Sequence, residues 1–168
     1  GRHHPPMPDP REPTTEQAAL LVAQAHWLAE RYEANSEGFL TRAGIFPVVH
    51  SMGIEGFCIA LHEDRPLVEE LLDRYTDWAC AVARRAGELG FDVFATADDV
   101  AFKTGPFFSP AVFREVVVPR LERLGRSLAL PWVAHSDGNI TPLLGDYAAV
   151  GVAGVHPIEH GAMDIRAV

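Results

Sequence analysis

The sequence predicts an α/β fold with a parallel sheet. Short apolar segments alternate along the chain with longer amphipathic ones, in the order helix, strand, helix, strand. Such alternation builds a parallel sheet because each helix returns the chain to the same edge. Apolar residues make up 48% of the 168 residues, which is enough for a substantial core. The length fits one domain with an extension.

The composition excludes several classes of protein. A formal net charge of −9 argues against nucleic acid or an anionic membrane as the main partner. No apolar run approaches the ~20 residues of a transmembrane helix. The start, "GRHHPPMPDPREP", lacks the apolar centre of a signal peptide. Cys58 and Cys80 lack metal-ligand spacing, so we expect reduced thiols in a cytoplasmic protein.

The N-terminal part divides into two segments. Five prolines within residues 1–13 predict an extended arm. Thr14 and Gln17 form a capping box, which predicts a helix to about residue 34. We expect residues 14–168 to form the domain.

A short apolar run and a long amphipathic segment follow. "AGIFPVV" predicts the first strand at about 44–49, although Pro47 is unusual inside a strand. "RPLVEELLDRYTDWACAVARRAGELG" predicts a helix with Pro66 in its first turn and Gly90 as its stop. Apolar residues on one face of that helix recur at spacings of three and four: Val68, Leu71, Leu72, Tyr75, Trp78, Ala79, Val82, Ala86 and Leu89.

The remaining elements repeat the alternation. "FDVFATADDV", "LPWVAHSDG" and "VAGVHPIE" are apolar runs that end in polar residues. Ser109 caps the helix after the first of them, and Pro119 predicts a kink within it. Gly151 ends the helix after the second. We expect strands at about 92–97, 131–136 and 152–158, and helices at about 110–128 and 141–150.

Polar clusters follow three of these strands. They are "TADD" at 96–99, "HSD" at 135–137 and "HPIEH" at 156–160. Ligands of parallel α/β folds bind at the carboxyl ends of the strands, which favours these clusters as a site. Neither "GxGxxG" nor "GxxxxGK[ST]" is present, so no nucleotide fingerprint supports another location.

Asp98 and Asp99 are candidates for catalysis with different roles. Adjacent side chains of a strand point to opposite faces. One carboxylate would then face the site and bind ligand groups, and the other would cap a loop or pair with Lys103. The alternative is that both only form a turn, which aspartate favours by itself.

His135 and Asp137 share a face if the strand extends that far. Imidazole and carboxylate are suitable ligands for zinc or another divalent ion, and Glu159 at the end of the next strand could join them. Asp137 could instead orient His135 for proton transfer. In a third interpretation, Asp137, Gly138 and Asn139 simply form a turn. We expect His156, which precedes a proline, to be structural.

The motifs resemble those of a known family. "GFDVFATADDVAFKTGPFFSPAVFREVVVPRLERL", "HSDGNITPLL" and "GVAGVHPIEHGAMDI" resemble the uroporphyrinogen decarboxylase (URO-D) family, which also holds cobalamin-dependent methyltransferases. The resemblance covers roughly residues 40–168. It implies a (β/α)8 TIM barrel, of which the sequence shows about four strands, so we expect a partial barrel. Such an open sheet would need a partner, most simply a second copy in a homodimer.

The resemblance also implies a metal site. In the methyltransferase branch a zinc ion is bound by a His-X-Cys motif and a later cysteine, with a glutamate nearby. His135 matches the histidine, Asp137 replaces the cysteine, and Glu159 falls at the glutamate. A carboxylate in place of a thiolate lowers the preference for a soft zinc–thiolate centre.

The implied function has three alternatives. The first is a methyltransferase that exchanges a methyl group between a corrinoid (cobalamin), held by a corrinoid protein, and a small acceptor or methoxylated compound. The second is uroporphyrinogen decarboxylase, a metal-free lyase of porphyrin biosynthesis. The third is a truncated fragment without activity. For the enzymes, we predict the catalytic residues Asp98, Asp99 and His135, the substrate-binding residues Phe107, Phe108 and Asn139, and the metal ligands His135, Asp137 and Glu159.

Overall fold

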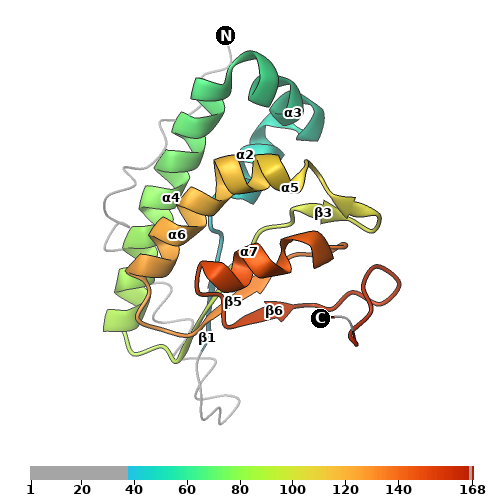
Figure 1. The fold of residues 1–168 in the computed structure, drawn as a ribbon. Helices are drawn as coiled ribbons and strands as arrows, with labels where there is room; N and C mark the ends of the chain where they lie inside the picture. Colours follow the sequence, from blue (N-terminus) through green and yellow to red (C-terminus); the bar gives the residue numbers. More distant parts are fainter. Residues whose placement is uncertain (1–37, 167) are drawn as a thin grey trace.

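One parallel sheet organises the part of the chain that the structure describes. The structure is a computed structural model and describes residues 38–166 and Val168, so the predicted arm at 1–13 and helix at 14–34 lie outside the described residues. The strand order is β1-β2-β5-β6, and every neighbouring pair is parallel (Figure 1). The strands are β1 (Gly38–Thr41), β2 (Val93–Ala97), β5 (Trp132–His135) and β6 (Gly154–His156). The parallel sheet and its last three strands are confirmed.

The predicted first strand is wrong. Residues 44–49 lie in a helix, α2 (Ile45–Met52), and the strand that precedes it is β1. Ile45, Val48 and Val49 are buried, which is helical spacing. Pro47 lies in the first turn, where its missing amide costs no hydrogen bond. The apolar run therefore buries one helical face.

The helices predicted from residue 65 onward are present, whereas α2 and the helix over Ile54–Glu63 were not predicted. Asp64 caps the long helix by accepting a hydrogen bond from the Leu67 amide, and Gly90 follows its end with φ +85°. The kink expected at Pro119 takes the form of a π-helical turn just before it. The helical elements are α3 (Ile54–Glu63), α4 (Arg65–Glu88), α5 (Pro110–Val112), η1 (Phe113–Val117), α6 (Val118–Ser127), η2 (Thr141–Leu143) and α7 (Leu144–Ala149).

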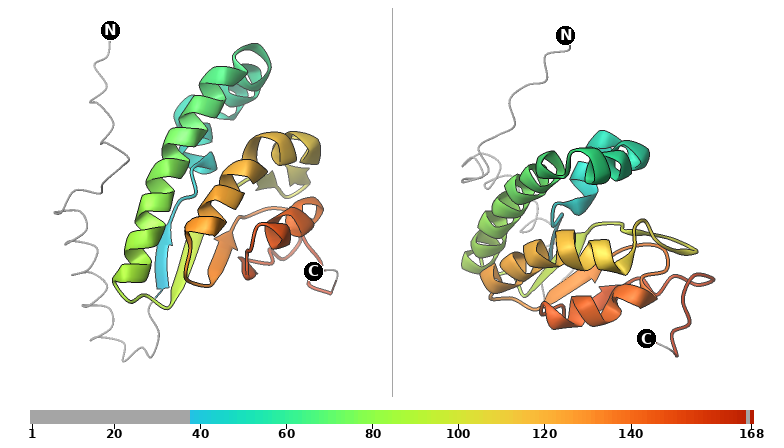
Figure 2. Two further views of the ribbon diagram at one scale, coloured as in Figure 1. Left: turned by 60° about the vertical axis from the view of Figure 1, so that its left-hand side comes forward. Right: turned by 45° about the horizontal axis from the view of Figure 1, so that its top comes forward.

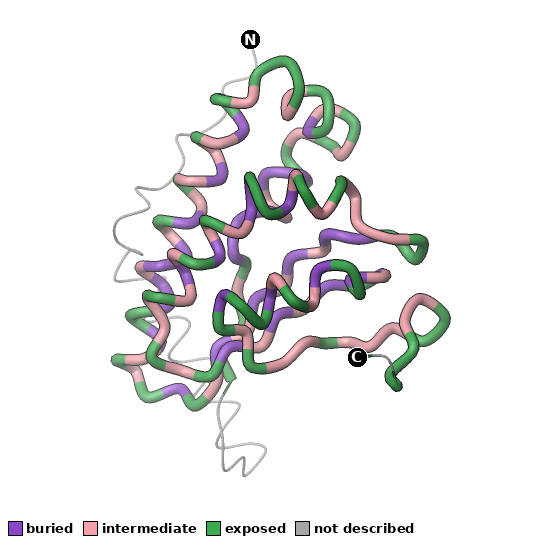
Figure 3. The backbone as a smooth tube through the Cα atoms, in the orientation of Figure 1, coloured by how far each residue is buried: buried purple, intermediate pink, exposed green. Residues whose placement is uncertain are grey.

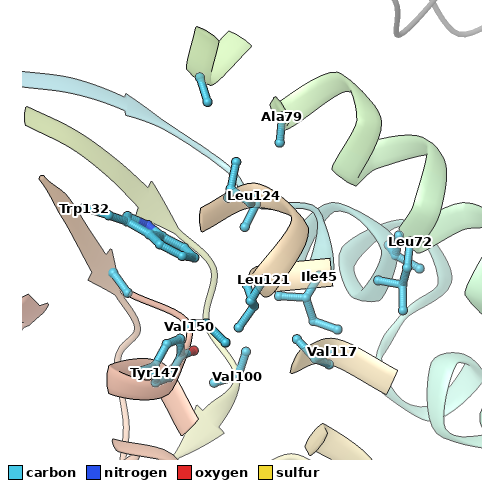
Figure 4. Packing of buried hydrophobic residues seen from close by; sticks show 14 of the residues in the cluster. Ile45, Leu72, Ala79, Val100, Val117, Leu121, Leu124, Trp132, Tyr147 and Val150 are labelled. Atoms are coloured by element: carbon cyan, nitrogen blue, oxygen red, sulfur yellow. The ribbon is translucent and has the colours of Figure 1, made fainter. Parts of the chain in front are cut away.

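The core lies between the sheet and the helices. Figure 2 shows α4, α6 and α7 side by side over one face of the sheet, and buried positions concentrate on the facing surfaces (Figure 3). Trp132 of β5 lies in this layer, and its indole Nε1 donates a hydrogen bond of 3.0 Å to Thr96 Oγ1. Figure 4 shows side chains from α6, β5, α7 and the residue that follows α7 converging there: Leu121, Leu124, Trp132, Tyr147 and Val150.

Within residues 38–166, fewer side chains cover the opposite face of the sheet. Strand β5 alternates between buried and half-buried residues, with Val133 and His135 on the half-buried side. Leu40 of β1 is 65% exposed. In a closed barrel this face is the interior, so the alternation agrees with the predicted partial barrel.

A small hairpin lies beside the carboxyl ends of the strands. Strands β3 (Ala101–Phe102) and β4 (Gly105–Pro106) pair antiparallel directly after β2. The Asn139 amide donates a hydrogen bond of 2.8 Å to Phe102 O, which ties the hairpin to the turn after β5. The hairpin thus belongs to the structure around the polar clusters.

No single helix within the described ranges is long and apolar enough to cross a membrane. Helices α2 and α3 reach that length and composition only when taken together, and they are bent by 100° at their junction.

Candidate functional site

The adjacent aspartates after β2 differ in environment: Asp98 is buried and Asp99 is half-buried. Asp98 is 5% exposed and accepts hydrogen bonds from the backbone amides of Ala43, Gly44 and Phe46, so it caps the start of α2. Burial raises the pKa of Asp98, and the three amides oppose that rise because they favour the charged form. The carboxylate of Asp98 is therefore engaged in holding the loop between β1 and α2. Of the two aspartates, Asp99 is therefore the one whose carboxylate is a candidate for binding a ligand or an ion.

Asp99, His135 and Asp137 form a polar cluster at the carboxyl ends of β2 and β5. One ligand atom from each lies within 4.8 Å of those of the other two. The His135 Nε2 atom is 3.6 Å from Asp99 Oδ1, and the two side chains are 28% and 32% exposed. Three donors of nitrogen and oxygen at this spacing can converge on one divalent ion. We call these three residues the Asp99 cluster.

Backbone hydrogen bonds fix the segment that carries His135 and Asp137. Asp99 Oδ1 accepts a hydrogen bond of 3.0 Å from the Asp137 amide. The carboxylate of Asp99 therefore holds the backbone of Asp137 in place. Ser136 is 1% exposed, and its Oγ accepts a hydrogen bond of 3.1 Å from the Val100 amide. The Asp98 amide donates a hydrogen bond of 3.0 Å to His135 O. The turn after β5 is thus bound to the chain after β2.

Glu159 lies beside the Asp99 cluster and outside it. Its Oε2 accepts a hydrogen bond of 2.7 Å from the Gly138 amide, and its Oε1 is 3.4 Å from Lys103 Nζ. The third member of the cluster, beside His135 and Asp137, is therefore Asp99 and not Glu159 as the sequence suggested. Lys103 pairs with Glu159, so of the two alternatives for the second aspartate, capping a loop is the one that Asp98 adopts. Glu159 joins three segments: the hairpin, the turn after β5 and the loop after β6.

We expect Glu159 to make stability depend on pH. The Gly138 amide, and to a lesser extent Lys103, lowers the pKa of Glu159 below its ordinary value of 4.5, although burial opposes this. Between the lowered and the ordinary pKa the folded state binds fewer protons than the unfolded state. The stabilisation is therefore fully present above about pH 4.5 and is lost as the pH falls through the lowered pKa.

Urea unfolding of the unmutated chain and of Glu159→Gln, measured between pH 2.5 and 7, would test this. We expect the unmutated chain to be more stable near neutral pH and the difference to shrink below about pH 4.5. Glu63→Gln, which removes an exposed carboxylate at the end of α3, is the control for the loss of one charge. A difference that stays constant over the whole range would contradict the lowered pKa.

His156, which was expected to be structural because it precedes a proline, lies next to His135 at the candidate site. It is paired in register with His135, so both side chains leave the same face of the sheet. The two Nδ1 atoms are 2.9 Å apart. The sequence pattern gave the strand end but not the register, and only the register makes the two histidines neighbours.

The three predicted substrate-binding residues have identifiable contacts. Phe108 packs between Phe57 and Phe113, with ring centroids 6.0 and 6.3 Å away, so core packing accounts for it. Phe107 packs on Phe102 of the hairpin at 4.6 Å. Asn139 Oδ1 accepts a hydrogen bond of 3.1 Å from the Thr141 amide, which is the turn role considered above.

The fold is an α/β domain of the barrel type, and the Asp99 cluster is a candidate site at the carboxyl ends of its parallel strands. The family model described as uroporphyrinogen decarboxylase (URO-D) matches residues 46–166. The chain therefore belongs to the uroporphyrinogen decarboxylase family.

Similar proteins include methyltransferases. Two proteins named methylcobamide:CoM methyltransferase MtaA, from Methanosarcina barkeri and its strain Fusaro / DSM 804, are 36% and 33% identical to this chain over 89 residues. That stretch covers 53% of this chain and 26% of each relative, so the match spans about a quarter of their length. A solved structure, a methyltransferase from Methanosarcina mazei, matches with a TM-score of 0.70 and 24% identity over 82% of this chain and 40% of that one. This likeness confirms the predicted fold, a partial barrel of the URO-D type.

Proposed function

We propose that this chain takes part in methyl transfer between a corrinoid and a small acceptor, with the Asp99 cluster as its metal site. The observation that carries the proposal is the convergence of Asp99, His135 and Asp137 within 4.8 Å at the carboxyl ends of the strands. The matched relatives named methylcobamide:CoM methyltransferase support the reaction class. The corrinoid enters as a substrate, free or held by a partner protein.

The residues of the Asp99 cluster fit a divalent ion. His135 offers one imidazole nitrogen, and Asp99 and Asp137 each offer a carboxylate oxygen. Three protein ligands leave a coordination position for an acceptor, as in catalytic zinc sites. An ion bound there would supply Lewis acidity toward the acceptor atom that receives the methyl group. Because the set contains no thiolate, it is harder than a His-X-Cys site and selects less strongly for zinc over harder ions, although its nitrogen and oxygen ligands still suit zinc.

The chain's own groups would hold this arrangement in place. The two carboxylates of the cluster balance the charge of a divalent ion. Asp99 Oδ1 also accepts the Asp137 amide, so the backbone at Asp137 is fixed before any ion binds. Glu159 holds the next amide, that of Gly138. A site whose ligands are fixed in this way loses little conformational entropy on binding.

Zinc binding by variants of the 168-residue chain would test the proposal. We expect the unmutated chain to bind zinc in calorimetric titration and His135→Ala to lose binding at this site, because one of three ligands is removed. His135→Ala should keep the fold, since a half-buried side chain at a strand end contributes little to the core.

His62→Ala is the matched control, because His62 is an exposed histidine at the end of α3. His3 and His4 are present in every variant, so any binding by them cancels in the comparison. Absence of zinc binding in the unmutated chain, or equal binding in His135→Ala, would contradict the metal site. Turnover of uroporphyrinogen by the metal-free chain would favour the decarboxylase alternative.

A further inference from the structure

The pair of histidines at the ends of β5 and β6 leads to a further inference. His135 and His156 are in register on neighbouring strands, and their ring centroids are 5.1 Å apart with an interplanar angle of 31°. Their Nδ1 atoms are 2.9 Å apart, which is hydrogen-bond distance. His156 is an exposed residue, so packing does not account for its side-chain position.

The direction of the hydrogen bond between the two rings determines which nitrogen of His135 carries the lone pair. A neutral imidazole has one N–H and one nitrogen lone pair. A hydrogen bond between the two Nδ1 atoms therefore requires one ring to donate and the other to accept. If His135 Nδ1–H donates, the lone pair of His135 lies on Nε2. If His156 donates, the proton of His135 lies on Nε2.

The Nε2 atom of His135 is the one that faces the Asp99 cluster, 3.6 Å from Asp99 Oδ1. Only the first direction leaves a lone pair there for an ion. Histidines that bind metals commonly donate their other ring N–H to an acceptor, which fixes the tautomer and the ring orientation. His156 Nδ1 is placed to be that acceptor.

We infer that His156 is a positioning residue for the metal site: it accepts a hydrogen bond from His135 Nδ1–H and so directs the lone pair of His135 Nε2 toward Asp99 and Asp137. The inference rests on the proposed function, because this tautomer of His135 matters only if an ion binds to its Nε2 atom. It assigns His156 a role that does not require contact with the ion.

Two substitutions of His156 separate this role from a structural one. Asn places its Oδ1 near the position of the histidine Nδ1 and keeps an acceptor. Leu has a similar size and no acceptor. We expect zinc affinity of the 168-residue chain, measured by calorimetry with zinc alone, to fall about 10- to 100-fold in His156→Leu. We expect His156→Asn to restore it to within a few-fold of the unmutated chain.

Nitrogen-15 chemical shifts of the His135 ring report the tautomer directly. In the zinc-loaded unmutated chain we expect the proton on Nδ1. In metal-free His156→Leu we expect the tautomer populations of His135 to differ from those of the metal-free unmutated chain. Thermal unfolding of both variants would show that the fold is kept.

The possible failures are distinguishable. Equal zinc affinity in the unmutated chain, His156→Leu and His156→Asn would overturn the role of His156 while the metal site stands. Equal losses in the Leu and Asn variants would also overturn it, because the acceptor would then not matter. An unmutated chain that binds no zinc would overturn the metal site itself. Unchanged His135 tautomers in metal-free His156→Leu would overturn the hydrogen-bond role whether or not zinc binds.

Discussion

Asp98→Ala is expected to destabilise the fold by at least about 3 kcal/mol, whereas Asp99→Ala is expected to cost less than about 1 kcal/mol. The Asp98 carboxylate is buried and accepts the amides of Ala43, Gly44 and Phe46. Its removal leaves these donors without their acceptor inside the protein, at the start of α2. Asp99 is half-buried and accepts the single amide of Asp137.

The two variants should differ in which property they lose. Asp98→Ala should mainly lower the free energy of unfolding, and Asp99→Ala should mainly lower zinc affinity. Asp99→Ala removes a ligand of the Asp99 cluster and should lower zinc affinity while the chain stays folded. Urea unfolding and calorimetric titration of the same two proteins would measure both quantities. Asp98→Asn is an informative control: it keeps the volume, but its amide group presents only one acceptor oxygen to three donors, so a large loss should persist. Similar stabilities of Asp98→Ala and Asp99→Ala would contradict the assignment of roles.

The strands that the sequence predicted correctly are those with strong local signals. "FDVFATA" and "PWVAH" are short apolar runs bounded by turn residues, and both form strands at nearly the predicted positions. The four residues of β1, "GFLT", include a glycine and no alternating pattern, so nothing local distinguishes them. Strand β1 exists because it pairs with β2, and pairing is a property of the folded chain.

The error at 44–49 has a tertiary cause. A short apolar run fits a buried strand or a buried helical face equally well. What selects the helix is the Asp98 carboxylate, which caps its start from 52 to 55 residues away. Gly44, with φ +122°, also lies so close to Tyr75 of α4 that a Cβ atom there would be 2.9 Å from Tyr75 Cβ. Neither contact can be inferred from the heptapeptide itself.

The candidate site was predictable in its location and less so in its partners. The rule that ligands bind at the carboxyl ends of parallel strands gave Asp99, His135 and Asp137. It could not decide between Asp99 and Glu159 as the third member, because that choice depends on the hairpin that brings Lys103 to Glu159. If Glu159 were to bind the ion, it would have to leave the Gly138 amide, and the turn after β5 would lose that support.

Gly138→Ala is expected to lower both stability and zinc affinity. Gly138 has φ +84°, and a Cβ atom there would lie 2.5 Å from Ala101 O and 2.7 Å from Phe102 O. These are backbone atoms of the hairpin and cannot move aside as a flexible side chain would. We expect a loss of about 2 kcal/mol or more in the free energy of unfolding. Because Asp137 is the preceding residue, its carboxylate should be displaced, with a fall of about tenfold or more in zinc affinity.

Gly151→Ala separates the close approach from the backbone conformation. Gly151 ends α7 with φ +96°, and no atom lies within 4 Å of the position of an added Cβ. Its substitution should cost only the left-handed conformation, about 1 kcal/mol, and should leave zinc affinity unchanged. Equal stability losses at both glycines would show that the hairpin yields to the new methyl group. Unchanged zinc affinity in a folded Gly138→Ala chain would show that the contact between the turn and the hairpin does not hold Asp137 in place, because that contact is the feature of Gly138 that Gly151 lacks.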